Sequence, residues 1–208
     1  GHTVRSERNV LLKDDELFKA LSFLFKKGLL HYVWNKMYVA EIIRNNLKFN
    51  NEISVGEDLV FNIQYISEIE NMFVLDNPLY NHVSNSKSIT KRYIPNLFNM
   101  RLEAIRIITT ILREKGCFEN ENEKVFNNLF TKYINRCINN IVFFKNDLSS
   151  TTKKQQLHAI ATHPEVVAFL PIFKEQGLFF RVVGLCLEKK KINILLLLYK
   201  LKSFIVKY

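Results

Sequence analysis

Two adjacent carboxylates, Glu57 and Asp58, follow Gly56 directly before a run of apolar residues. Those apolar residues recur with the period of a helix, which predicts a helix over residues 57–70 with both acids in its first turn. The helix dipole and the free N–H groups at that end keep a carboxylate ionised. An ionised carboxylate beside a substrate hydroxyl can accept the hydroxyl proton as a new bond forms. The pair is therefore a candidate for general-base catalysis.

The same residues also have a structural interpretation. Ser54 and Glu57 have the spacing of a capping box, in which the serine caps the helix and the glutamate reaches back to it. Acidic residues are common in the first turn of a helix because they interact favourably with its dipole. The local pattern alone leaves open whether the two acids are catalytic or structural.

Three motifs occur in a fixed order within residues 10–95. They are VWNKMY at residues 33–38, GEDLVFN at residues 56–62, and DNPLY at residues 76–80 followed by SIT at residues 88–90. This order resembles bacterial family 2 glycosyltransferases, which commonly show a W-N-K-hydrophobic-Y segment, then an E-D pair that opens a helix, and then a P-L-Y strand before S-I-T. On these motifs the chain is similar to the C-terminal part of such an enzyme.

The resemblance implies a GT-A enzyme that transfers a sugar from a nucleoside-diphosphate donor to a hydroxyl of a saccharide or lipid-linked acceptor. It implies that Asp58 is the general base for the acceptor hydroxyl and that Glu57 orients the acceptor or the helix end. A carboxylate that is held ionised is a weak base, so the positioning of the reactants must supply much of the rate.

Trp34, Asn35 and Lys36 form a second group of candidate substrate-binding residues. The indole could stack against a sugar ring, and Lys36 could contact a phosphate or the acceptor. The alternative is that Trp34 packs in the core and that Asn35 satisfies local backbone groups. His82 follows the P-L-Y segment, where many GT-A enzymes place a histidine as a metal ligand or a pyrophosphate contact, although a lone histidine is more often structural.

The groups that would bind the donor are missing from the sequence. The family holds its nucleotide on an N-terminal Rossmann-like half, and it holds a divalent cation, Mn²⁺ or Mg²⁺, with a D-x-D motif. This sequence contains neither a D-x-D motif nor a Gly-rich turn between a strand and a helix. The resemblance therefore implies that these groups precede residue 1 in a longer parent, that no cofactor binds this fragment, and that the fragment is inactive alone.

The elements that position these residues are mostly helices, predicted from apolar periodicity and from stop signals such as Gly28. Helices are predicted over residues 13–27, 38–46, 57–70, 94–115 and 121–146, with two or three more in 153–207 that are interrupted by Pro164, Pro171 and Gly177. Short strands are predicted at residues 29–34, 72–75 and 79–83, the first of them alternatively a buried turn.

The predicted fold class is α+β and mostly helical. It combines the acceptor-side end of a GT-A domain over residues 1–90, with few short strands, and a helical bundle extension over residues 91–208. The boundary is placed in the polar loop at residues 84–88. Of the 208 residues 48% are hydrophobic, which is enough for a core and excludes a disordered or fibrous chain.

The three cysteines are far apart in the sequence, and each lies among apolar neighbours. They are expected to be reduced and buried, and they lack the C-x-x-C spacing of a zinc site. No apolar run is long enough to span a bilayer. The expected location is the cytoplasm, including the inner face of the membrane.

The net charge of +10 is concentrated near the C-terminus, where residues 189–208 contain six lysines and no acid around a wide apolar face. A basic helix with a broad apolar face is typical of a membrane interface, where lysines contact anionic headgroups. The alternative is a terminal helix that packs on residues 94–146 and leaves its lysines in solvent.

A second class of function is a non-enzymatic, basic helical module that binds nucleic acid or an acidic partner. It would explain the charge but not the order of the three motifs. The sequence also lacks zinc ligands, a glycine-anchored RNA motif and a helix-turn-helix pattern. Nucleic acid is therefore not the expected partner.

Overall fold

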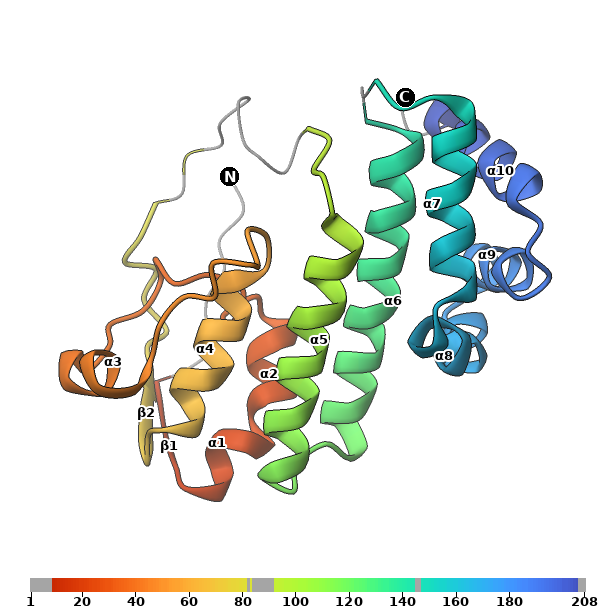
Figure 1. The fold of residues 1–208 in the computed structure, drawn as a ribbon. Coiled ribbons are helices and arrows are strands. Elements are labelled where there is room, and N and C mark those ends of the chain that lie inside the picture. Colours follow the sequence, from red (N-terminus) through yellow and green to blue (C-terminus); the bar gives the residue numbers. More distant parts are fainter. Residues whose placement is uncertain (1–8, 82, 84–91, 145–146, 206–208) are drawn as a thin grey trace. The chain divides into compact units, whose positions relative to one another are not determined.

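The computed structural model describes residues 9–81, 83, 92–144 and 147–205, and these are mostly helical (Figure 1). Within them lie ten helices and two short strands, which confirms the predicted α+β, mostly helical fold class. In chain order the elements are β1 (Val10–Lys13), α1 (Asp15–Lys19), α2 (Leu21–Lys26), α3 (Ala40–Asn46), α4 (Glu57–Ser67), β2 (Asn71–Val74), α5 (Leu97–Glu114), α6 (Asn120–Val142), α7 (Ser150–Thr162), α8 (Pro164–Glu175), α9 (Leu178–Glu188) and α10 (Ile192–Ile205).

Contacts within the chain group it into two compact units. The first unit comprises residues 1–84 and 99–126, and the second comprises residues 85–98 and 127–208. Each unit therefore combines segments that are distant in sequence. The polar loop predicted to separate the two domains, residues 84–88, lies outside the described residues. The division into residues 1–90 and 91–208 stays a prediction.

The N-terminal segment of the first unit forms a strand and two short helices, so the single helix predicted over residues 13–27 was wrong. β1 pairs antiparallel with β2, and Lys13 lies opposite Asn71 in this ladder. Asp14, with φ 45, turns the chain from β1 into α1, and its N–H donates to the Glu70 carbonyl at 2.8 Å. The spacing of apolar residues indicates the structure of one segment at a time. It could not show that residues 10–13 would pair with a strand as distant in sequence as β2.

The end of α2 follows the sequence prediction. Gly28 has φ 73, a left-handed conformation that a residue without Cβ adopts at little cost. The Leu29 N–H then donates back to the Leu24 carbonyl at 2.9 Å, which satisfies one of the last carbonyls of the helix. This closure fixes the direction in which the chain leaves α2 toward the first motif.

β2 matches the strand predicted at residues 72–75 to within one residue. Its partner is β1, so the ladder is supplied by the N-terminal segment and not by the segment that follows β2. The strand predicted at residues 79–83 is not formed by the described residues 79–81 and 83. Residues 29–34 form bends and a turn, which was the alternative to a strand there.

The longer helices match their predictions closely, because each has a regular apolar face. α4 starts at Glu57 as predicted and ends three residues earlier than predicted. Five side chains were predicted to face inward along it. Leu59, Val60, Ile63 and Ile66 are almost fully buried, whereas Ile69 lies beyond the end of the helix and is only half-buried. A helix face of this kind is stabilised mainly by the packing of these side chains.

Two buried asparagines on α6 fix backbone segments within the two units. In the first unit, Asn122 Oδ1 accepts from the Ser22 N–H at 2.9 Å, and Nδ2 donates to the Phe18 carbonyl at 2.7 Å. In the second unit, Asn140 accepts from the Ile94 N–H at 2.9 Å and donates to the Ile94 carbonyl at 2.8 Å. Buried polar groups are stable only when they are hydrogen-bonded. Each asparagine side chain therefore favours the one backbone arrangement that satisfies both its oxygen and its nitrogen.

Residues 150–205 form four helices, α7 to α10, where two or three were predicted over residues 153–207. Pro164 opens α8 and Gly177 separates α8 from α9, as predicted. Pro171 lies inside α8, so the prediction that it interrupts a helix was wrong. A proline removes one backbone hydrogen bond from a helix, and the burial of Leu170 and Phe173 on either side holds this turn in place.

Candidate functional site

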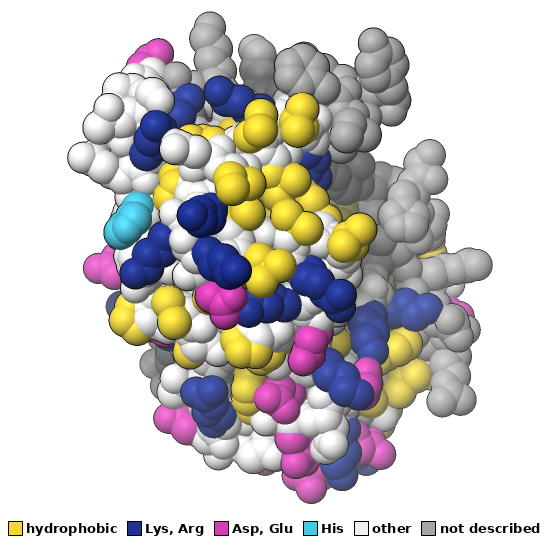
Figure 2. Space-filling view, turned by 90° about the vertical axis from the view of Figure 1, so that its right-hand side faces the viewer, with side chains coloured by type: hydrophobic (Ala, Val, Ile, Leu, Met, Phe, Trp, Pro, Cys, Tyr) yellow, Lys and Arg dark blue, Asp and Glu magenta, His cyan; other side chains and the backbone are white. Residues whose placement is uncertain are grey.

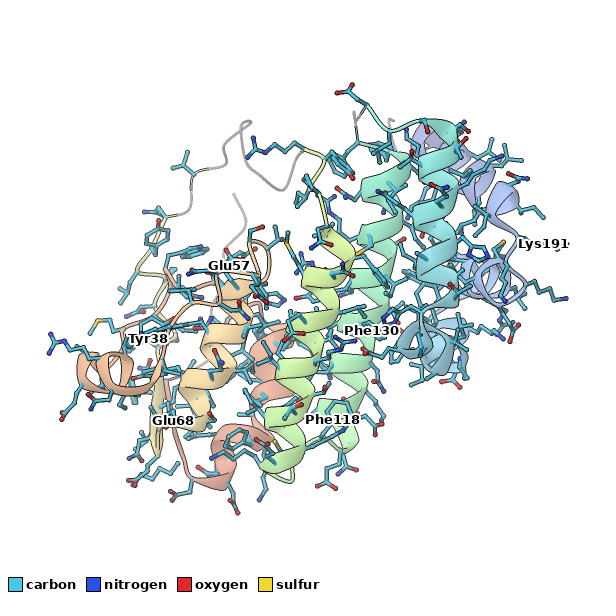
Figure 3. The ribbon with its side chains drawn as sticks, in the orientation of Figure 1. Tyr38, Glu57, Glu68, Phe118, Phe130 and Lys191 are labelled. Carbon is cyan, nitrogen blue, oxygen red and sulfur yellow. The ribbon has the colours of Figure 1, made fainter. Side chains whose placement is uncertain are left out.

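Glu57 and Asp58 lie in the first turn of α4, as predicted, and Glu57 is labelled in Figure 3. The residue before the helix is Gly56, with φ 92, and it has no side chain to cap the helix. Ser54 lies outside this position, and its Oγ is 3.3 Å from the Met100 Sδ. The predicted capping box was therefore wrong, because a left-handed glycine and not Ser54 begins the helix.

The Asp58 carboxylate connects the first two motifs. Asp58 is half-buried, and its Oδ2 accepts a hydrogen bond from the Val33 N–H at 3.3 Å. The structure thus brings the VWNKMY segment against the start of α4, although Val33 and Asp58 are 25 positions apart in the sequence. A backbone donor at this place orients one oxygen of the carboxylate.

Asn62, one helical turn after Asp58, fixes the loop that contains the first motif. It is buried, and its Nδ2 donates to the Leu30 carbonyl at 2.7 Å and to the Tyr32 carbonyl at 3.1 Å. Its Oδ1 accepts from the Tyr38 hydroxyl at 2.6 Å. Sequence reasoning gave Asn62 no role. The available signal was a polar residue among the inward-facing apolar positions of α4.

Lys36 points its ammonium group into the same loop. Its Nζ donates to the carbonyls of Leu29 and Tyr32, the latter at 2.6 Å, and to the Asn35 Oδ1 at 2.7 Å. Burial lowers the pKa of Lys36 to about 8, while the negative charge of Asp58 acts in the opposite direction. Through these hydrogen bonds Lys36 stabilises the loop. Its predicted contact with a phosphate or with the acceptor stays a prediction.

The lowered pKa of Lys36 makes the stability of the fold depend on pH. Between about pH 8 and the ordinary lysine value of 10.5, the unfolded chain binds more protons at this residue than the folded chain. The contribution of Lys36 to the free energy of unfolding therefore increases as the pH rises through this window, and it falls as the pH falls. We expect Lys36→Met to lack this increase in urea denaturation between about pH 7 and 9.5. Equal slopes in both proteins would contradict the expectation.

Three aromatic side chains connect the first motif with the third. Trp34 is half-buried and stacks with Tyr32 at a centroid distance of 4.9 Å and with Tyr80 at 4.5 Å. Both tyrosines are exposed to solvent. We call Tyr32, Trp34 and Tyr80 the aromatic stack. Trp34 thus packs against other rings, and its predicted contact with a sugar stays a prediction.

His82 lies outside the described residues, as does the SIT segment at residues 88–90. The predicted metal or pyrophosphate role of His82 therefore stays a prediction. Among the described residues, no group of three or more His, Cys, Asp or Glu side chains could hold a metal ion. The candidate site consists of Asp58 and Glu57 on α4 together with the aromatic stack and Lys36.

No protein-family model matches the chain, and no solved structure matches it. Over 86 residues the chain is 33% identical to EpsJ of Bacillus subtilis (strain 168), which is named an uncharacterized glycosyltransferase. The matched segment is 41% of this chain and 25% of EpsJ, so the chain spans about a quarter of the length of this relative. Part of the chain is therefore related to a protein named as a glycosyltransferase.

Proposed function

We propose that this chain is the acceptor-side part of a family 2, GT-A glycosyltransferase in which Asp58 is the general base. The similarity to a glycosyltransferase-named protein supports the transferase role. The observation that supports the residue assignment is the position of Asp58, whose carboxylate lies in the first turn of α4 and accepts from the Val33 N–H. The same backbone segment presents two members of the aromatic stack.

The proposed reaction uses the second oxygen of Asp58. Among the described residues, Val33 is the donor to this carboxylate, and it contacts Oδ2. Oδ1 would accept the proton of the acceptor hydroxyl while that oxygen forms a bond to the anomeric carbon of the donor sugar. The bond from the anomeric carbon to the diphosphate breaks, and the nucleoside diphosphate leaves with the electron pair. Asp58 supplies proton transfer, and orientation of the two substrates supplies much of the remaining rate.

The aromatic stack supports a saccharide acceptor. Tyr32 and Tyr80 are exposed, and Trp34 fixes them by stacking with both. The C–H faces of a sugar ring pack well on aromatic rings, whose polar edges remain available for hydrogen bonds. Because Tyr32 and Val33 are adjacent, an acceptor sugar on this stack would place a hydroxyl near Asp58. Glu57 would orient the acceptor from the start of α4.

Residues outside this chain would bind the donor. A divalent cation, Mn²⁺ or Mg²⁺, would neutralise the donor diphosphate there, and the reaction would take place at the cytoplasmic face of the membrane. Titration calorimetry of this chain with uridine and guanosine diphosphate sugars, with and without Mn²⁺, is expected to show no binding at micromolar concentrations. A longer protein that includes the donor-binding half is expected to bind one of them. Tight, metal-dependent binding to the 208-residue chain would contradict this division of the enzyme.

A further inference from the structure

The helices α9 and α10 in the second unit each expose a row of aliphatic side chains. The spacing of these residues places each row on one helix face. The exposed fractions are 78% for Leu178, 36% for Val182 and 41% for Leu185 on α9, and 53% for Ile194, 57% for Leu197 and 52% for Leu201 on α10. Figure 2 views the molecule from the side on which α8, α9 and α10 lie in Figure 1, and it shows hydrophobic side chains gathered among Lys and Arg side chains.

These exposed rows are not the result of helices that fail to pack. Val183 and Leu187 on α9, and Leu195 and Tyr199 on α10, are almost completely buried. The Tyr199 hydroxyl also donates to the Asn135 Oδ1 at 2.7 Å. A helix on the surface of a soluble unit needs one apolar face, and α9 and α10 each have a second one. Exposed apolar side chains gathered on one helix face are typical of an interaction site.

The surroundings of the two rows are strongly basic. Residues 178–202 contain six Lys and Arg side chains and one carboxylate. That carboxylate, Glu188, accepts a hydrogen bond from Lys174 at 2.7 Å, so its charge is compensated within the unit. Lys189, Lys190 and Lys191 are exposed in the turn between α9 and α10, and Lys191 is labelled in Figure 3.

In the turn between α9 and α10, Lys190 has a backbone conformation that glycine usually adopts. The Lys190 N–H donates to the Leu187 carbonyl at 3.0 Å, and the Lys191 N–H donates to the Cys186 carbonyl at 2.8 Å. This hydrogen-bond pattern places Lys190 in the left-handed conformation, with φ 52. A side chain in this conformation is unfavourable relative to glycine. The sequence therefore places a third adjacent ammonium group in this turn at a cost in stability.

We infer that the surface formed by the two rows and the lysines 189–191, the α9–α10 surface, binds the anionic face of a lipid bilayer. The aliphatic side chains would enter the boundary between headgroups and acyl chains, and the lysines would contact anionic headgroups. A nucleic acid would satisfy the lysines but would leave the leucines in water. No described helix of the chain is long and apolar enough to span a membrane, so the inferred contact is peripheral. The inference does not depend on the proposed chemistry.

Sedimentation with lipid vesicles tests this inference on the 208-residue chain. We expect binding to vesicles of phosphatidylcholine mixed with phosphatidylglycerol, and little binding to phosphatidylcholine alone. Moderate salt should weaken the binding but not abolish it, because the charge interaction is screened and apolar burial is not. No sedimentation with anionic vesicles at low salt, or complete release by moderate salt, would overturn the inference.

Variants of the exposed rows separate the apolar contribution from the charge. The triple variant Leu178→Ser/Leu197→Ser/Leu201→Ser changes only exposed side chains and is expected to lose the salt-resistant binding, by tenfold or more at moderate salt, which is about the effect of burying one leucine. The control Met37→Ser/Leu79→Ser changes two exposed apolar side chains of the first unit and is expected to bind as the parent does. Circular dichroism checks that each variant is folded. Equal losses in both variants would overturn the assignment to this surface.

Lys190→Gly separates binding from stability. Glycine relieves the left-handed backbone, so the melting temperature is expected to rise, while the loss of one lysine is expected to weaken vesicle binding about fivefold at low salt. A variant that is more stable and binds less tightly cannot owe its weaker binding to unfolding. Unchanged vesicle binding would contradict the inference. Binding of duplex DNA or tRNA that is as tight as vesicle binding, and that the serine triple variant leaves unchanged, would also overturn it in favour of nucleic acid.

Discussion

Asp58→Asn is expected to lower kcat for glycosyl transfer by about 10²–10⁴-fold in an active protein that contains this chain. The asparagine oxygen can still accept from the Val33 N–H, so the start of α4 is expected to keep its structure. The amide cannot accept a proton from the acceptor hydroxyl, so the proposed general base is lost. The release of nucleoside diphosphate in the presence of acceptor measures the rate.

The neighbouring acid provides a matched control for this substitution. Glu57→Gln removes a charge from the same helical turn. It is expected to change kcat less than tenfold, because the proposed role of Glu57 is to orient the acceptor and not to accept the proton. The affinity for the donor is expected to change by less than about twofold in both variants, because neither side chain is proposed to contact the donor. Turnover of Asp58→Asn that is comparable to the parent would exclude Asp58 as the base.

Asn62→Leu is expected to lower the free energy of unfolding of the first unit by about 2–4 kcal/mol. The substitution leaves the buried Leu30 carbonyl without its hydrogen-bond partner. It also removes one of two donors to the Tyr32 carbonyl and the nearer of two acceptors of the Tyr38 hydroxyl. Each buried polar group that loses its partner costs about 1–3 kcal/mol. Urea denaturation followed by fluorescence measures the effect on this unit, because the chain has one tryptophan and Trp34 lies in the affected loop.

Two further variants show how much of the stability lost in Asn62→Leu comes from the hydrogen bonds of the Asn62 side chain. Tyr38→Phe removes one of the three hydrogen bonds and is expected to cost about 1–2 kcal/mol. Asn193→Leu replaces an exposed asparagine and is expected to change stability by less than about 0.5 kcal/mol. A loss below about 1 kcal/mol for Asn62→Leu would mean that water or a shifted loop satisfies these groups.

The elements that the sequence predicted well are those specified by neighbouring residues. The start of α4 follows from an acidic pair before regular apolar spacing, and the end of α2 follows from Gly28. The burial of Leu59 and Ile63 follows from the same spacing. Such features depend on backbone geometry and on burial along one helix, which are local properties.

The features that the sequence did not predict depend on partners far along the chain. β1 requires β2, and the capping box was replaced by Gly56 because Ser54 faces Met100 instead. The stacking of Trp34 with Tyr80 and the three hydrogen bonds of Asn62 also join distant segments. In the candidate site, the motif order indicated which residues to consider, but contacts across the first unit determine how they meet.

The buried asparagines of α6 give each unit its own reporter of opening. The Ser22 N–H, which helix geometry leaves without an acceptor within α2, donates to Asn122, and the Ile94 N–H, which precedes α5, donates to Asn140. Both amides therefore exchange with solvent deuterium only when a side-chain contact inside their unit breaks. Ser22 belongs to the first unit and Ile94 to the second. The exchange rates of two amides in one sample thus distinguish independent opening of the units from a single cooperative transition.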